Sequence, residues 1–244
     1  SQLEYQKYTY YDADLGNNSK FGYINTTGNF EIEPIFYKAS DFSQGRAFVN
    51  IRAENIITET GFSLSMDGFI INKNGVTMSP NIMNTQAWEY SPDGYLPAYN
   101  FVISMLFGAG SYFIDTSYNH FPKYNGEELY FNDITIFRDG IAGVRIGDFW
   151  RVIDTKSNIL IDEKFSDVKT CSEGLMPVKN INKWKYLDLN GTYAFNLEFD
   201  SCSRFYDGLA YVEKYERNTT IKGYINKKGD YIWQKIIINN KVKE

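Results

Sequence analysis

The sequence predicts an all-β protein built from tandem hairpin repeats. Three observations support this prediction: a phrase of the form Phe-x-x-Gly-x-Ala-x-Val that returns five times, short Asp/Asn-x-x-Gly turns between alternating segments, and an aromatic content of 17%. Aromatic residues favour pleated, half-buried surfaces, and self-similarity at a fixed period is typical of repeat architectures. No segment keeps a helical periodicity over three turns, so we expect little helix.

Five closing glycines define the repeat: Gly45, Gly94, Gly140, Gly174 and Gly208. Their successive spacings are 49, 46, 34 and 34 residues, so the unit is 34 residues long and the earlier copies carry insertions. Insertions in such arrays usually emerge as loops on one face, often the binding face. The insertions lie mainly in Ile51–Asp67, Tyr99–Ser111 and Asn119–Tyr130.

Apolar positions recur at fixed distances from each glycine, and they predict the core. Stacked repeats bury a core that no single unit could bury alone. The positions nine, six and three residues upstream and four downstream of the glycine are mostly Phe, small apolar residues or Val. Nine residues upstream lie Phe36, Thr85, Phe131, Phe165 and Phe199, and six upstream lie Ala39, Trp88, Ile134, Val168 and Cys202. Three residues upstream lie Phe42, Ser91, Phe137, Cys171 and Phe205, and four downstream lie Val49, Ala98, Val144, Val178 and Val212.

Each copy opens with a predicted hairpin. In the first copy, residues 23–25 and 30–33 flank a short turn that ends at Gly28, where glycine is available for positive φ. An Asp or Asn that opens such a turn accepts backbone hydrogen bonds, so we interpret these side chains as turn formers and not as a catalytic carboxylate pair. They are Asn25, Asp115, Asp154, Asp188 and Asn226, and the same logic applies to the Asp-Gly pairs at Asp93, Asp139 and Asp207.

The copies organise the whole chain into one predicted domain, residues 1–244. We expect five full repeats and a C-terminal half-repeat in an open twisted array; the alternative is a closed propeller-like ring, in which a strand at residues 3–11 completes the sixth copy. The repeats span approximately residues 21–50, 68–99, 111–145, 149–179, 183–213 and 223–236.

Three local features add detail to this scheme. The apolar run Phe101–Phe107 predicts a buried strand, since it is far shorter than the ~20 residues of a membrane-spanning helix. The Phe-x-x-Gly pieces, such as residues 42–45, predict a single 3₁₀ or α turn. Pro97 is expected to interrupt the last strand of the second copy.

The pattern resembles the WG repeat, also called the KWG repeat, of bacterial proteins. That repeat reads roughly Gly-Tyr-Ile-Asp-x-x-Gly, then Pro-x-Phe-x-x-Ala, then Phe-x-x-Gly-x-Ala-x-Val, and the resemblance covers roughly residues 21 to 233. The first copy matches nearly throughout, and the second and third depart most. The resemblance implies a β-repeat fold with a binding or scaffold role, and it brings no catalytic residues. The matching residues are Gly22, Tyr23, Ile24, Asn25, Gly28, Pro34, Phe36, Ala39, Phe42, Gly45, Ala47 and Val49 in the first copy, and Trp184, Tyr186, Leu187, Asp188, Gly191, Phe199, Phe205, Gly208, Ala210 and Val212 in the fifth.

Groups that could carry chemistry are few. Cys171 and Cys202 occupy core positions, which predicts buried thiols, although a bridge between the adjacent copies is conceivable. His120 is the single histidine and is expected to be a solvated loop imidazole. We therefore expect no enzyme, no metal site and no cofactor.

Charge and termini limit the partners. The net charge of −5 and the pI near 5.1 disfavour nucleic acid, and no membrane span is expected. The sequence shows no signal peptide, so we expect a cytoplasmic protein. Because the chain starts at Ser1 with no Met, a periplasmic or surface location after removal of a signal is the alternative.

A binding site is predicted where the copies stop agreeing. Trp88, Tyr90, Tyr95, Tyr99 and Phe101 form an aromatic surplus in the second copy; the alternative is that they fill space left by Thr85 and Ser91. The predicted function is a non-catalytic protein-binding module, in one form a bacterial immunity or inhibitor protein against a basic toxin domain. A secreted or surface carbohydrate or ligand binder is the alternative, and an enzyme is the third class.

Overall fold

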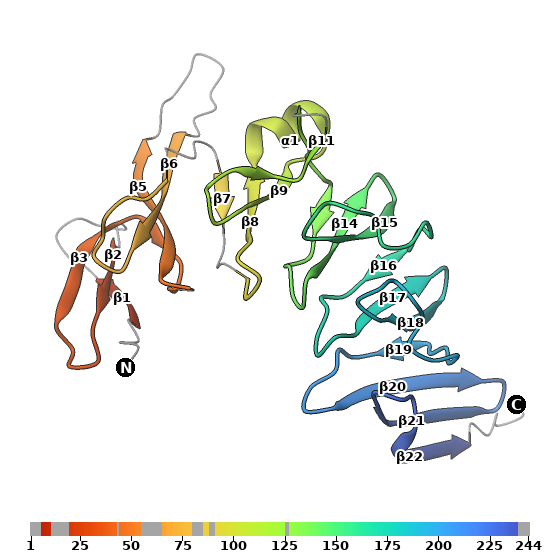
Figure 1. The fold of residues 1–244 in the computed structure, drawn as a ribbon. Helices are drawn as coiled ribbons and strands as arrows, with labels where there is room; N and C mark the ends of the chain where they lie inside the picture. Colours follow the sequence, from red (N-terminus) through yellow and green to blue (C-terminus); the bar gives the residue numbers. More distant parts are fainter. Residues whose placement is uncertain are drawn as a thin grey trace, which may run out of the picture. The chain divides into compact units, whose positions relative to one another are not determined.

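The computed structural model describes residues 6–10, 20–42, 44–54, 65–79, 85–87, 91–124 and 127–238. It is nearly all β, with small antiparallel sheets that follow one another along the chain and a single short helix among the described residues (Figure 1). The chain divides into two compact units, Ser1–Tyr130 and Phe131–Glu244. An all-β fold of tandem hairpin repeats is thereby confirmed, while one domain and an open array stay predictions.

The first unit holds four sheets. The sheet β1-β2-β3 is followed by β4-β5-β6, by β10-β9-β8-β7 and by the two-stranded β11-β12. Their strands are β1 (Gln6–Tyr10), β2 (Lys20–Ile24), β3 (Phe30–Phe36), β4 (Lys38–Ala39), β5 (Arg46–Glu54), β6 (Ser65–Asn72), β7 (Thr85–Ala87), β8 (Leu96–Asn100), β9 (Ser111–Ile114), β10 (His120–Phe121), β11 (Lys123–Tyr124) and β12 (Glu127–Glu128), with the helix α1 (Phe101–Phe107) between β8 and β9.

The second unit holds three sheets, β13-β14-β15, β16-β17-β18 and β19-β20-β21-β22. In the first two, the place of a fourth strand is taken by isolated bridges such as Trp150↔Phe165 and Trp184↔Phe199. The strands are β13 (Asp133–Ile134), β14 (Ile141–Ile146), β15 (Phe149–Asp154), β16 (Asp167–Val168), β17 (Met176–Asn180), β18 (Lys183–Leu187), β19 (Ser201–Cys202), β20 (Leu209–Glu216), β21 (Thr219–Asn226) and β22 (Tyr231–Ile238).

A sequence copy does not coincide with a sheet. The copy at residues 149–179 gives β15 to one sheet and β16 and β17 to the next. The C-terminal half-repeat therefore supplies β21 and β22 to the last sheet, where they pair with β20. At the other end, β1 pairs with β2 and so completes the first sheet.

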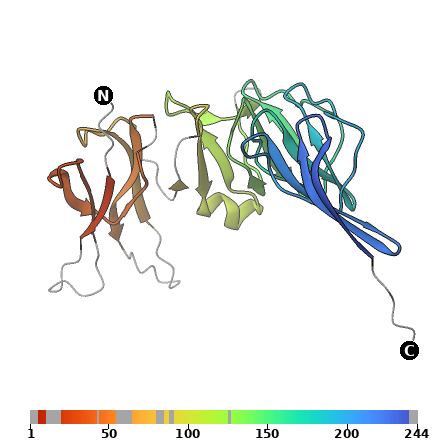
Figure 2. The ribbon, with the colours of Figure 1, turned by 90° about the horizontal axis from the view of Figure 1, so that it is seen from below.

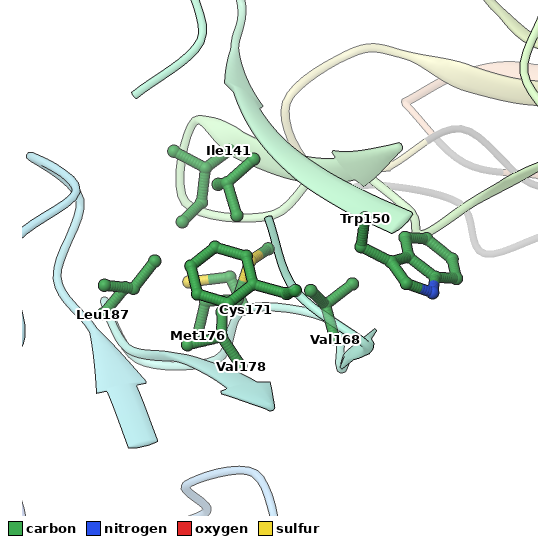
Figure 3. Packing of buried hydrophobic residues seen from close by; sticks show 9 residues of the cluster. Ile141, Trp150, Val168, Cys171, Met176, Val178 and Leu187 are labelled. Carbon is green, nitrogen blue, oxygen red and sulfur yellow. The ribbon is translucent and has the colours of Figure 1, made fainter. Parts of the chain in front are cut away.

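The apolar positions predicted from the glycine spacing form the core. Phe36, Phe131, Phe165 and Phe199 are all buried, as are all the predicted Val positions. Figure 3 shows one such cluster, in which Ile141, Val168 and Met176 lie together between two consecutive sheets. Each cluster joins one sheet to the next, as stacked repeats require.

The Asx side chain that opens each hairpin turn is confirmed as a turn former. In the fifth copy, the Oδ1 atom of Asp188 accepts hydrogen bonds from the backbone N–H groups of Asn190 and Thr192, each at 2.9 Å. The same pair of bonds, to the residues two and four positions on, recurs in every copy. The six side chains are Asn25, Asn72, Asp115, Asp154, Asp188 and Asn226.

In four of the five copies, all but the second, the closing glycine and the residue before it both have positive φ, as in a two-residue hairpin turn, so the predicted 3₁₀ or α turn is wrong there. Glu173 and Gly174 both have positive φ, 55° and 81°, and Ser172 and Leu175 exchange backbone hydrogen bonds across them. Two consecutive left-handed residues are typical of a type I′ turn, whose twist matches that of the flanking strands. A right-handed helical turn would splay the two strands that must pair here.

In three copies, the residue before the closing glycine also links consecutive turns. The Oδ2 atom of Asp139 accepts a hydrogen bond from the Gly174 N–H at 2.8 Å, and the Oε2 atom of Glu173 accepts one from the Gly208 N–H at 3.0 Å. In the first unit, the Gln44 amide donates to the Ser91 carbonyl at 2.9 Å. Asp139, Glu173 and Gln44 therefore do more than form local turns, because their side chains link one copy to the next.

Pro97 does not interrupt its strand. It lies inside β8, and Pro177 occupies the same repeat position inside β17. In the other three copies, the N–H at this position donates to a Ser or Thr hydroxyl and not to the neighbouring strand, so proline forfeits no ladder bond here. Those three bonds are Phe48 to Ser40, Gly143 to Thr135 and Tyr211 to Ser203.

Candidate binding surface

The five aromatic residues of the predicted site are only partly described. Trp88 and Tyr90 lie outside the described residues, and Phe101 is the first residue of α1, with a side chain that is not among those described. Tyr95 directly precedes β8 and Tyr99 lies within it, and both are half-buried. Whether the five rings form one surface stays a prediction.

Tyr95 packs within its own sheet. Its ring lies 4.8 Å from the ring of Phe121 and 6.5 Å from that of Phe113, which is fully buried. Its backbone N–H donates to the Ser91 hydroxyl at 3.1 Å. These contacts favour the space-filling interpretation for Tyr95, beside the buried Ser91 that replaces an aromatic residue of the repeat.

The insertion 99–111 folds into α1, so the buried strand predicted for Phe101–Phe107 is wrong. Tyr99 pairs with Ser111, and the Asn100 N–H donates to the Gly110 carbonyl at 2.7 Å, so the two ends of the insertion are held together. An extended strand cannot return to its own start. A seven-residue helix spans only about 10 Å, against about 23 Å for a strand, so the few residues after it can close the loop. Figure 2 shows α1 at the ends of β8 and β9.

Both ends of α1 are capped. The Asn100 side chain accepts a hydrogen bond from the Ile103 N–H at 3.1 Å, and Gly108 adopts a left-handed φ of 71° while its N–H donates to the Ser104 carbonyl. Asparagine at the N-cap and glycine just after the last turn are strong helix boundaries. Asn100 and Gly108 flank the apolar run directly, and this pair was the sequence signal that could have identified the helix.

The C-terminal half of α1 exposes large apolar side chains. Met105, Leu106 and Phe107 are 66%, 68% and 74% exposed. Three consecutive exposed apolar residues at the tip of an insertion form a surface that packing within the described chain does not use. Sequence reasoning missed these residues because it assigned the run to the core.

Charge is distributed unevenly along the chain. Residues 1–130 contain 14 Asp and Glu against 7 Lys and Arg, whereas residues 131–244 contain 16 against 18. The unit that carries α1 is therefore strongly acidic, and the other is nearly neutral. Such a field favours the approach of a basic partner to the first unit.

His120 is not a solvated loop residue as predicted. It lies in β10 with its side chain only 4% exposed, and its ring stacks on Tyr112 at 4.4 Å and meets Tyr130 edge-on at 4.6 Å. The Nε2 atom lies 2.7 Å from the Leu129 carbonyl, so Nε2 carries the proton, and Nδ1 lies 3.7 Å from the Glu128 carboxylate. Burial lowers the pKa of His120. The insertion 119–130 turns back over the sheet through β11 and β12 and so covers the imidazole.

The two cysteines are buried and free, as their positions in the repeat predict. Burial raises the pKa of Cys202 to about 11, which keeps it a thiol at neutral pH. Among the described residues, no group of three or more His, Cys, Asp or Glu side chains is placed to hold a metal ion. Within that same part of the chain, no helix has the length and apolar character needed to cross a membrane.

Several solved structures are similar to this chain in fold. Citrobacter koseri AztD is 12% identical over 90% of this chain and 66% of its own, with a TM-score of 0.49. A eukaryotic initiation factor is 9% identical over 96% and 63%, at 0.53, and prolyl oligopeptidase B from Galerina marginata is 10% identical over 97% and 41%, at 0.50. The chain thus spans less than two thirds of the length of these structures. At such identities the likeness concerns the fold alone, which is that of a propeller-like β-repeat protein.

A known repeat family matches parts of the sequence. The WG containing repeat matches residues 21–52, 150–184 and 186–216, so the expected WG repeats are confirmed in these three segments. These segments come from the copies that keep the sequence pattern of the repeat, and the insertion-rich second copy lies outside them. A comparison with curated proteins finds no match.

Proposed function

We propose that this chain is a non-catalytic protein-binding repeat module whose partner docks on α1 and the acidic unit around it. The observation that carries the proposal is the exposure of Met105, Leu106 and Phe107 at the tip of the insertion 99–111. Apolar residues that no packing explains are typical anchors of protein interfaces. Insertions on repeat arrays are also common binding sites.

The carboxylates of the repeat support a non-catalytic role. In three copies Asp115, Asp154 and Asp188 each accept two backbone hydrogen bonds from their own turn. Those hydrogen bonds and the Asn158 side chain lower the pKa of Asp154 against the opposing effect of burial, so the group stays ionised and acceptor-only. A general acid needs the opposite shift.

The partner we propose is a basic protein. The first unit carries twice as many acidic as basic residues, and complementary charge speeds association and selects partners. A basic toxin domain held by an immunity protein is one partner of this kind. The other four aromatic residues of the predicted site, Trp88, Tyr90, Tyr99 and Phe101, lie in the same insertion-bearing part of the sequence, and we propose that they contribute to binding.

A site-specific photocrosslinker tests the location. Placed at Leu106, it should capture a basic protein in cells that make this chain, whereas the same group at Ile181, a 77% exposed apolar residue of the second unit, should not. The captured protein is then purified and its affinity measured. Leu106→Ser and Phe107→Ser should each weaken binding by ~2 kcal/mol or more, and Ile181→Ser should leave it unchanged. Equal capture at both positions, or affinity that the α1 variants leave intact, would remove α1 from the interface.

Salt dependence tests the charge argument separately. The association rate should fall as salt rises from roughly 0.05 to 0.5 M, because screening shortens the reach of the acidic field. A rate that stays constant over this range would contradict a basic partner while leaving the apolar anchor intact.

A further inference from the structure

The last sheet ends the second unit with an aromatic face in place of a polar one. Its outer face, defined here as Leu209, Tyr211, Tyr215, Tyr224 and Trp233, comes from three strands in direct register. Tyr211 lies opposite Tyr224 with ring centroids 5.5 Å apart, and Tyr224 lies opposite Trp233 at 6.3 Å. Terminal repeats normally carry a polar outer face, which keeps an array soluble.

The repeat shows what this face is built to contact. Tyr224 occupies the position that Tyr186 occupies one sheet earlier, and Leu209 the position of Leu175. Tyr186 and Leu175 are 0% and 7% exposed because they pack against the next sheet, whereas Tyr224 and Leu209 are 44% and 37% exposed. The outer face of the last sheet is therefore a sheet-stacking face that no other sheet covers within the described part of the second unit.

The opposite kind of face lies at the start of the array. In β3, Ile32 and Phe36 are buried toward the following sheet, and the residues that alternate with them, Glu31, Glu33 and Ile35, are exposed. The name outer face of the first sheet is used here for these three exposed residues of β3. This part of β3 presents two carboxylates beside one apolar side chain, and the Glu31 carboxylate accepts a hydrogen bond from the Asn25 side chain at 2.7 Å.

The charges of the two outer faces are complementary. Lys222 and Lys235 lie opposite each other in β21 and β22, two residues from the Tyr224 and Trp233 pair. Lys222 is paired with Glu213 at 2.9 Å, and the hydroxyl of Tyr211 donates to the same carboxylate at 2.6 Å. Lys235 is exposed on the edge strand and leaves this face with an added positive charge. The acidic first unit and the slightly basic second unit follow the same polarity.

We propose that the outer face of the last sheet docks on the outer face of the first sheet of a second copy of this chain. Such a contact repeats the sheet-on-sheet stacking of the array and adds pairing between Lys235 and the Glu31 and Glu33 carboxylates. The contact is heterologous, because it joins two different surfaces. Every copy offers the outer face of its first sheet, the head, and the outer face of its last sheet, the tail. The assembly is therefore a ring or a growing chain of copies. The tilt of the aromatic rings, 63° and 51° between neighbours, fits an interdigitated protein contact and not a flat platform for a sugar.

Light scattering and sedimentation on the purified chain test the association. The mass should rise above the 28.3 kDa of one chain as concentration increases over roughly 1 to 500 µM, the range in which interfaces of modest affinity dissociate. Trp233→Asp should weaken association by at least ~tenfold, since central aromatic residues dominate interfaces, and Ile181→Asp serves as the matched exposed control. A mass that stays that of one chain throughout would overturn the proposal.

Mixing two variants tests the head-to-tail geometry. Trp233→Asp removes the tail, and Glu31→Lys with Glu33→Lys removes the head, so each variant alone should be monomeric. An equimolar mixture retains one intact head and one intact tail and should give dimers that grow no further. If the head variant still self-associates alone, the contact is tail to tail and the proposal fails. If Leu106→Ser abolishes association while Trp233→Asp does not, the copies meet through α1 instead, which also contradicts it. All these positions are exposed, and circular dichroism confirms that each variant is folded.

Discussion

The sheet β16-β17-β18 and the sheet β10-β9-β8-β7 follow the same repeat but use it differently. In β16-β17-β18 the copies keep the 34-residue spacing, and the described core positions are filled by Phe165, Val168, Cys171 and Val178. In the other sheet, Ser91 stands in a core position and the two insertions emerge as α1 and the β11–β12 hairpin. The comparison teaches that close agreement with the repeat marks packing, and departures mark where exposed groups collect.

The largest expected effect is in the regular sheet. Phe165→Ala should destabilise the protein by ~3 to 5 kcal/mol, because the fully buried ring leaves a cavity between two sheets. Phe36→Ala and Phe199→Ala should behave alike. Phe149→Ala, in which the ring is 48% exposed on the neighbouring sheet, is the control and should cost less than ~1 kcal/mol. Urea unfolding measures both, and equal costs for Phe165 and Phe149 would sink the assigned core.

The next effect comes from the turn that closes each regular copy. Gly174→Val should cost ~1 to 3 kcal/mol, since Gly174 has a φ of 81° and a β-branched residue resists that conformation. A Cβ at Gly174 would meet nothing within 4 Å, so the penalty is one of backbone strain and not of collision. Gly174→Asn, which tolerates positive φ, should lose distinctly less stability in the same unfolding experiment. A Val variant as stable as the parent would argue against the left-handed turn.

A smaller effect should follow when the link between consecutive turns is removed. Asp139→Gly keeps the positive φ but deletes the carboxylate that accepts the Gly174 N–H, and should cost about 1 kcal/mol. Asp139→Asn retains an acceptor oxygen and a side chain suited to positive φ, so it should be nearly neutral. Thermal unfolding of the pair decides the matter: a Gly variant that matches the Asn variant would mean that the bond contributes nothing.

The irregular sheet should show the weakest effect, a dependence of stability on pH through His120. Burial lowers its pKa in the folded state, so the unfolded chain binds the proton more tightly. Stability should therefore be full above the unfolded pKa of about 6.5 and decrease as pH falls from there toward the folded pKa. The groups around the ring are Glu128 and Lys123, with Tyr112 and Tyr130. His120→Phe should flatten this part of the pH profile between pH 7.5 and 5.5, and an unchanged slope would exclude the imidazole as its source.

How far the fold could be predicted depends on the residue type. Phe36, Phe165 and Phe199 were placed in the core from spacing alone, because a stacked array buries the same position in every unit. Asp188 and its equivalents were identified as turn formers because an Asx side chain bonds to its own backbone within four residues. Both effects are local or periodic, and the sequence displays them directly.

The sequence by itself determined the repeat, its register, the Asx turns and the buried thiols, since each follows from interactions within one unit or from their repetition. Only the tertiary structure decided which halves of neighbouring copies share a sheet, that Phe101–Phe107 is a helix, and that His120 is covered. The reason is that these features depend on what pairs across space: Tyr99 with Ser111 closes the loop that must become helical, and Tyr112 and Tyr130 enclose the imidazole. Neither the composition of the sequence nor the period of its repeat predicts these contacts between distant residues.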